Sequence, residues 1–214
     1  ENAMREETRR YFAHVLQQNR SIQDFIDSDY TFLNEPLARH YGIPGISHQE
    51  FRQVKLKPEH QRGGLLGHGS VLTATSNGVE TQPVLRGVWI LENLLGTPPS
   101  PPPPDIEPIE PDVRGVSTIR ELMEKHRNNA TCFECHRKID PLGLAMEPYD
   151  FLGRWRDRYA KKIPLNATGN MPDGTAINGP GGIRDYLKKR PAQFTRCLTE
   201  KLWVYAMGRR ISFT

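Results

Sequence analysis

Apolar residues recur at helical spacing in several parts of the chain, most clearly in the segment TQPVLRGVWILENLLG, residues 81–96. Apolar positions three or four residues apart indicate an amphipathic helix that buries one side. Thr81 can cap this helix, Pro83 suits its first turn, and Gly96 follows its last turn as a stop. The stripe that we expect to be buried consists of Val84, Val88, Leu91 and Leu95.

Shorter helices are predicted before this segment by their start and stop signals. Ser21 precedes an apolar run and has Asp24 three residues later, a spacing similar to a capping box. Asn34 can cap the segment NEPLARHYG, which has Pro36 in its first turn and Gly42 at its end. The N-terminal region is therefore expected to consist of short helices joined by turns.

The second half of the chain shows the same signals. Thr118 and Glu121 have capping-box spacing at the start of one helix, and Pro191 separates the last two. Cys197 lies on the apolar side of the final helix, together with Phe194, Leu198, Leu202 and Tyr205, and is expected to be a small core residue. The predicted elements are helices in TIRELMEKHR, IRDYLKKR and AQFTRCLTEKLWVYAMG, a loop in NATGNMPDGTAINGPGG, and a short strand in FRQVKL.

A proline-rich segment, TPPSPPPPDIEPIEP at 97–111, interrupts the helical pattern. Consecutive prolines exclude helix and interior strand and favour an extended polyproline II spacer. We therefore expect a mainly α protein in which a helical docking region, residues 1–105, is joined by this strap to a cytochrome-c-like helical domain, residues 112–214.

Composition and charge narrow the class of protein. The chain has 214 residues, 36% of them hydrophobic, and a mean hydropathy of −0.62, with no apolar run long enough to span a bilayer. The first residues lack the apolar core of a signal peptide, and we expect the chain to be part of a longer protein. Residues 105–214 hold 19 Lys and Arg against 14 Asp and Glu, whereas residues 1–104 hold 10 against 11. The basic surplus could steer an acidic partner, but no nucleic-acid recognition motif accompanies it.

The candidate chemistry lies in TCFECHRKIDPLGLAMEPYDFLGRWR, where Cys132, Cys135 and His136 form a C-x-x-C-H motif. In a c-type haem site the two thiols add to the haem vinyl groups, and the histidine supplies the proximal iron ligand. Zinc would need four ligands, and no second pair at regular spacing follows. A thiol redox pair would be expected after a strand, whereas a helix is predicted here. The spacing favours haem, with zinc and thiol chemistry as alternatives.

The residues after the motif resemble the corresponding segment of small monohaem cytochromes c. In that resemblance, the carbonyl of Pro148 would accept a hydrogen bond from His136, which would fix its ring and raise its basicity. Arg154, Trp155 and Arg156 would be candidates for contacts with the haem propionates, or alternatively would form a surface turn.

The chain also resembles a family of large bacterial proteins, typical of planctomycetes, that carry the domains of unknown function DUF1592, DUF1588 and DUF1585. The resemblance rests on DFIDSDYTFLNEPLARHYGIPG, on the stretch from RGGLLGHGS to the strap, on the motif segment, and on KLWVYAMGRR. We assign the first two to a central module and the last two to a haem-binding one. The resemblance implies one covalent haem c and a location outside the cytoplasm, in the periplasm or an equivalent compartment.

The second axial ligand of such a haem is left open by the sequence. Met171 lies in the Gly- and Pro-rich loop, His68 lies between two glycines, and His126 is ten residues before His136. Met146 is expected to be a core residue. A strong ligand on this side would make an electron carrier, whereas an open position would allow ligand binding or peroxide chemistry.

One-electron transfer by haem c is the function that these observations favour, in a domain rather than an enzyme of its own. The partner would be a redox protein or another domain of the same longer chain, with no nucleic acid and no membrane span. Two alternatives remain: a haem enzyme of the peroxidase type, and a haem-free zinc or interaction module.

Overall fold

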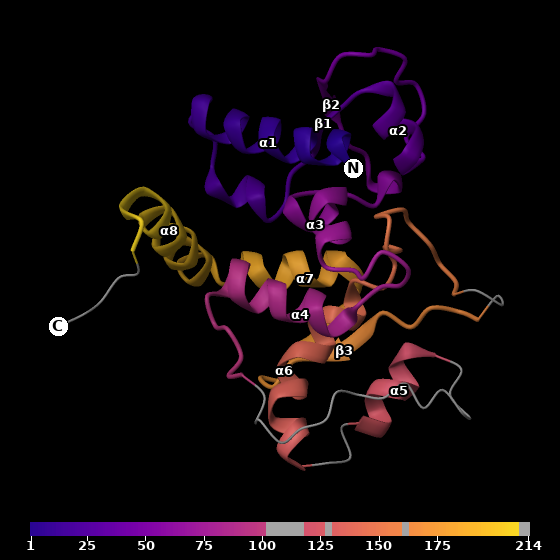
Figure 1. Ribbon diagram of the computed structural model, residues 1–214, viewed down its shortest axis with the longest axis vertical. Helices are drawn as coiled ribbons and strands as arrows, with labels where there is room; N and C mark the ends of the chain where they lie inside the picture. Colours follow the sequence, from indigo (N-terminus) through magenta and orange to yellow (C-terminus); the bar gives the residue numbers. More distant parts are fainter. Residues whose placement is uncertain (102–117, 127–129, 160–162, 210–214) are drawn as a thin grey trace.

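Helices dominate the described part of the chain, and the strands pair into two-stranded antiparallel sheets (Figure 1). The computed structural model describes residues 1–101, 118–126, 130–159 and 163–209, without the side chains of residues 125, 126, 130 and 131. The predicted mainly α fold is confirmed. The helices are α1 (Asn2–Gln17), α2 (Glu35–Tyr41), α3 (Gly69–Ala74), α4 (Pro83–Ile90), α5 (Ile119–His126), α6 (Ala130–Ala145), α7 (Gly179–Lys188) and α8 (Pro191–Met207), and a π-helical turn over Leu91–Leu95 continues α4. The strands are β1 (Tyr30–Leu33), β2 (Arg52–Lys55), β3 (Thr168–Asn170) and β4 (Ala176–Asn178), and short 3-10 turns cover Ile22–Phe25, Pro58–His60 and Leu65–Gly67.

A buried carboxylate holds the N-terminal elements together. Glu7 on α1 accepts hydrogen bonds from the hydroxyl of Thr31 on β1, at 2.7 Å, and from that of Tyr41 on α2, at 2.6 Å. Tyr41 in turn accepts the backbone N–H of Gly69, the first residue of α3, at 2.8 Å. Because each oxygen of the buried Glu7 has a donor, its burial is tolerated and the four elements are fixed relative to one another.

The capping signals at α2 and α5 are confirmed in detail. The side chain of Asn34 accepts the backbone N–H of Leu37 at 3.2 Å, and Gly42 ends α2 in the left-handed conformation, at φ 73°. At the start of α5, the backbone N–H of Glu121 donates a hydrogen bond to the Thr118 hydroxyl, and the backbone N–H of Thr118 donates one to the Glu121 carboxylate. Local sequence therefore determines where these helices begin.

Replacement of the α2 cap should have a small, measurable effect. We expect Asn34→Ala to lower the free energy of unfolding by about 1 kcal/mol, because one N-terminal N–H of the helix loses its acceptor. Gln82 provides the matched control, since it occupies the same position before α4 and makes no side-chain cap. Urea denaturation of both variants tests this: an equal loss in Gln82→Ala would mean that the cap bond is not the cause.

Helices α4 and α6 pack against each other more closely than ordinary side chains allow. A Cβ atom at Gly143 of α6 would overlap the backbone carbonyl of Pro83, and one at Gly87 of α4 would overlap the carbonyl of Ile139. The two glycines therefore let the two backbones touch. This contact fixes the position of α6, which carries the C-x-x-C-H motif, relative to the rest of the molecule (Figure 1).

One hydrophobic core contains residues from both sides of the proline-rich strap. Tyr11 and Phe25 near the N-terminus belong to the same buried cluster as Ile139, Tyr149 and Leu187. The predicted boundary between residues 105 and 112 lies outside the described residues, so the division into two domains stays a prediction. Within the described residues, the two regions share their interior.

Two expectations about local structure need correction. Thr81 does not cap α4, because its hydroxyl is donated to the carboxylate of Glu147, at 3.0 Å, and Gln82 takes the cap position. The predicted loop contains the β3–β4 hairpin and the start of α7. The predicted strand in FRQVKL, by contrast, is confirmed as β2, paired with β1.

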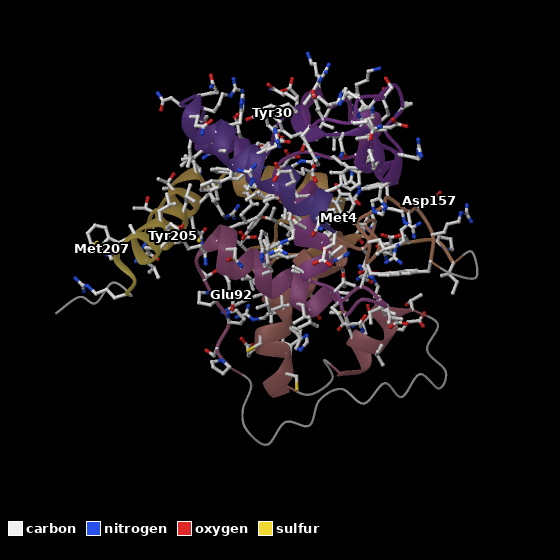
Figure 2. The ribbon with its side chains drawn as sticks, turned by 45° about the horizontal axis from the view of Figure 1, so that its top comes forward. Met4, Tyr30, Glu92, Asp157, Tyr205 and Met207 are labelled. Atoms are coloured by element: carbon white, nitrogen blue, oxygen red, sulfur yellow. The ribbon has the colours of Figure 1, made fainter. Side chains whose placement is uncertain are left out.

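The last helix is only partly buried. Phe194 and Cys197 are in the core as expected, whereas Leu202 and Tyr205 of the predicted apolar side are exposed. Figure 2 shows Tyr205 and Met207 on the part of α8 that extends away from the rest of the molecule. Among the described residues, no helix has the length and apolar character needed to cross a bilayer.

Candidate functional site

The C-x-x-C-H motif lies in the first turns of α6, which runs from Ala130 to Ala145 and includes Pro141. Cys132 is buried, and Cys135 is half-buried and packs against the main core. All three cysteines are free thiols, so none is consumed in a disulfide. Because residues four apart lie on the same side of a helix, Cys132 and His136 share one side of α6.

The ring of His136 is held by a carboxylate on the next turn of the same helix. Its Nδ1 lies 2.8 Å from Oδ1 of Asp140, which is fully buried. When Nδ1 carries the proton and donates it to this carboxylate, Nε2 carries the lone pair that can bind a metal. The contact with Asp140 thus holds the ring of His136 from within α6 and favours the tautomer with the proton on Nδ1.

The carbonyl of Pro148, expected to accept from His136, has a backbone partner in this structure. The carbonyl of Pro148 accepts the backbone N–H of Arg156 at 2.7 Å, in the turn that follows α6. Because α6 stays helical through Pro141, Asp140 lies one turn from His136 and takes the position of hydrogen-bond acceptor. The sequence carried a signal for this, since an acidic residue four positions after a histidine faces it on a helix.

A cleft of about 440 Å³ opens between α6 and the β3–β4 hairpin. This volume lies in the range of small-molecule and cofactor pockets, roughly 300–1,000 Å³. Asp140 contributes to its wall, and Arg120 and Arg137 bring two positive charges to it, whereas Cys132, Cys135 and His136 are not among its lining residues. The wall is completed by Phe133, Pro141, Leu144, Thr168, Gly169, Asn170, Ala176, Ile177 and Asn178.

Two of the residues expected to contact the haem propionates have other partners in the structure. Arg154 donates to the carboxylate of Asp150 at 2.9 Å, and the ring of Trp155 packs edge-on against Tyr149 at 5.3 Å. Neither residue lines the cleft beside α6. Trp155 and Pro148 instead line a separate cavity of about 270 Å³, near the start of α7. The alternative expectation, a turn packed at the surface, describes this segment better.

The third predicted arginine, Arg156, belongs to a buried charge network that sequence reasoning did not find. Arg156 and Thr81 both donate to one carboxylate oxygen of Glu147, at 2.9 and 3.0 Å. Arg86 on α4 lies 3.9 Å from the other oxygen and donates to the backbone carbonyls of residues 146, 149 and 150. Burial lowers the pKa of Arg86 to about 10. The network anchors the turn after α6 to α4.

The candidate second ligands have different surroundings in the structure. His68 is buried in the N-terminal part, with Nδ1 2.9 Å from the hydroxyl of Thr8 and its ring 4.8 Å from that of Tyr11, and burial lowers its pKa. Met146 and Met171 are buried in the main core, and neither lines the cleft. The side chain of His126 lies outside the described residues.

In the part of the chain that is described, no group of three or more His, Cys, Asp or Glu side chains could hold a metal ion. A complete zinc site of the kind considered from the sequence is therefore not formed by the described side chains. The motif fits a group that forms covalent bonds to two thiols and needs one imidazole from the protein.

Comparison with protein families gives three matches that follow one another along the chain. Residues 1–43 match DUF1592, residues 62–159 match DUF1588, and residues 173–214 match DUF1585, each a protein family of unknown function. Successive segments of the chain are thus similar to these three families. This confirms the resemblance found in the sequence. No curated protein and no solved structure matches the chain.

The matches also show how the stretches that carry the resemblance are divided among the three families. The DUF1588 segment includes the stretch RGGLLGHGS, the strap and the complete C-x-x-C-H motif, so the motif and α4 belong to the same family segment. This agrees with the close packing of α4 on α6. The stretch KLWVYAMGRR falls in the DUF1585 segment instead.

Proposed function

We propose that this chain is a c-type cytochrome module that carries one haem, attached through Cys132 and Cys135 and ligated by His136. What carries the proposal is the arrangement on α6: two free thiols and an imidazole in consecutive turns, with Nδ1 of His136 held by Asp140. The residues present fit the group, because two thiols and one imidazole on a single helix are what a c-type haem takes from the protein. A haem bound in this way supplies an iron that exchanges one electron.

The chain itself would orient the ligand and control the surroundings of the iron. Packing of α6 on α4 holds the motif in place, and the cleft next to Asp140 offers apolar walls with two arginines at its border. Arginine is suited to propionate carboxylates because its planar group donates two parallel hydrogen bonds. The electron partner would be a redox protein or another domain of the same protein, in an extracytoplasmic compartment where thiols and haem are joined.

The test is covalent haem in protein matured in a bacterial periplasm. We expect one haem per chain by pyridine haemochrome assay and by intact mass after denaturation. Cys132→Ser and Cys135→Ser should each leave at most one thioether bond, and the double variant should lose all covalent haem. Cys197→Ser is the matched control, since this thiol lies on α8 in the core, and it should keep full haem content. Colourless wild-type protein with free thiols would refute the proposal.

A haem enzyme of the peroxidase type is separated from an electron carrier by the second axial position. Rapid carbon monoxide binding to the reduced protein would indicate an open iron and favour the enzyme. Slow or no binding, with a six-coordinate absorption spectrum, would favour electron transfer.

A further inference from the structure

The pair of His136 and Asp140 is more than a surface contact between neighbouring charges. The Nδ1–Oδ1 distance is 2.8 Å, the side chain of Asp140 is 1% exposed and that of His136 is 13% exposed. A buried carboxylate is costly unless a partner compensates it. The carboxyl group of Asp140 therefore lies in the interior, with Oδ1 next to Nδ1 of His136, the ring nitrogen opposite the expected iron-binding nitrogen.

The helix around this pair is rigidly placed. Ile139 and Gly143 on α6 lie against the backbone of Gly87 and Pro83 on α4. Because Asp140 lies between these two contact positions on the same helix, its backbone cannot move away from His136 without disturbing the helix pair. The carboxylate is thus preorganised to accept the proton on Nδ1.

We propose that Asp140 is a positioning residue that holds Nδ1–H of His136 through its carboxylate and thereby lowers the reduction potential of the haem bound by that histidine. The inference rests on the proposed function and deepens it. A carboxylate acceptor raises the basicity of a ligating imidazole more than a neutral carbonyl does, because it gives the ring partial imidazolate character. Greater electron donation, and the nearby negative charge, both favour ferric over ferrous iron.

The decisive variant is Asp140→Asn, which keeps the size of the side chain and an oxygen acceptor but removes the charge. Outer-shell partners of this kind alter metal-site equilibria by roughly 10–100-fold. We therefore expect the ratio of ferrous to ferric protein at a fixed potential to rise by at least about tenfold. For a one-electron couple this is a positive shift of about 59 mV in the midpoint potential. Spectroelectrochemical titration of periplasm-matured protein measures the shift, and the absorption spectrum reports the axial ligation.

Two further variants separate the direct contact from other effects. Asp140→Glu keeps the carboxylate and should restore most of the wild-type potential. Asp150→Asn is the control, because Asp150 is also a buried aspartate of the DUF1588 segment but contacts Arg154 and the backbone after α6. This variant should shift the midpoint potential much less than Asp140→Asn. Haem content is measured in all variants before the titration.

The outcomes are distinct from those of the function test. If wild-type protein carries no covalent haem, the proposed function itself fails. If haem is attached and the potential of Asp140→Asn is unchanged, or rises no more than that of Asp150→Asn, the role of Asp140 is overturned. Should Asp140→Asn lose its haem, retention in Asp140→Glu would support the carboxylate, whereas loss in both would show that the charge is not what the site requires.

Discussion

Arg86→Met is expected to lower the free energy of unfolding by about 3–5 kcal/mol, which is typical when one partner of a buried ion pair is removed and the other is left in place. The guanidinium of Arg86 is 1% exposed and donates to the carbonyls of Met146 and Tyr149 at 2.9 and 2.7 Å. Methionine fills similar space but donates nothing. The carbonyls lose charge-assisted donors, and the buried carboxylate of Glu147 loses one of its two cations.

Arg86→Lys tests whether charge alone is needed. Lysine keeps the positive charge but has a single ammonium group, which cannot reach several carbonyls with the fork of a guanidinium. We therefore expect it to recover only part of the stability lost in Arg86→Met. Full recovery would show that the hydrogen-bond geometry contributes little.

The matched control is an arginine whose ion pair lies at the surface. Arg196 pairs with Glu200 one turn further along α8, at 2.8 Å, and its side chain is 75% exposed. Arg196→Met should leave the urea midpoint unchanged, because solvent screens such pairs. If Arg86→Met were equally neutral, the network after α6 would not be a source of stability.

The elements that the sequence predicted well are those whose signals are local. The cap of Asn34, the stop at Gly42 and the reciprocal bonds of Thr118 and Glu121 each involve residues within one helical turn. Neighbours in the sequence are sufficient to form such contacts, so their residue types alone indicate the structure. The C-x-x-C-H motif is local in the same sense, because its three residues are carried by a single helix.

The parts that the sequence did not predict depend on partners far away in the chain. The stripe chosen for α4 was apolar, yet its buried side also includes Arg86 and Gly87. Arg86 is buried because its guanidinium donates hydrogen bonds to carbonyls that follow α6, some sixty residues later in the chain. Gly87 is buried because the backbone of α6 lies directly against it. Periodicity of apolar residues cannot reveal a buried cation or a backbone contact.

The candidate site also has one part that the sequence predicted and one part that it did not. The thiols and the histidine were predicted from their spacing, whereas the acceptor for Nδ1 was sought at Pro148, beyond the end of the helix. That expectation assumed that the chain leaves the helix soon after the motif. Instead α6 continues to Ala145, and Asp140 becomes the neighbour of His136. A proline at position 141 concealed this continuation, since proline within a helix usually ends or kinks it.

Gly143→Ala should destabilise the protein more than a single methyl group normally does. The new Cβ would overlap the carbonyl oxygen of Pro83, and a backbone atom cannot move aside as a flexible side chain can. Either α4 and α6 separate or both bend, and overpacking of this kind costs about 1–3 kcal/mol or more. The loss outweighs the gain of up to about 1 kcal/mol that alanine brings to an ordinary helix position.

Gly181→Ala is the control for this variant, because Gly181 also lies in a helix, α7, and its nearest obstacle is the end of a flexible side chain at 3.8 Å. It should be neutral or slightly stabilising in the same urea titration. Because α4 carries Arg86 and α6 carries the motif, separation of the two helices should also disturb the geometry of His136 and Asp140. Gly143→Ala is therefore expected to lower haem content after periplasmic maturation, whereas Gly181→Ala should not. Equal stability and equal haem content in the two variants would show that the close helix contact is not required.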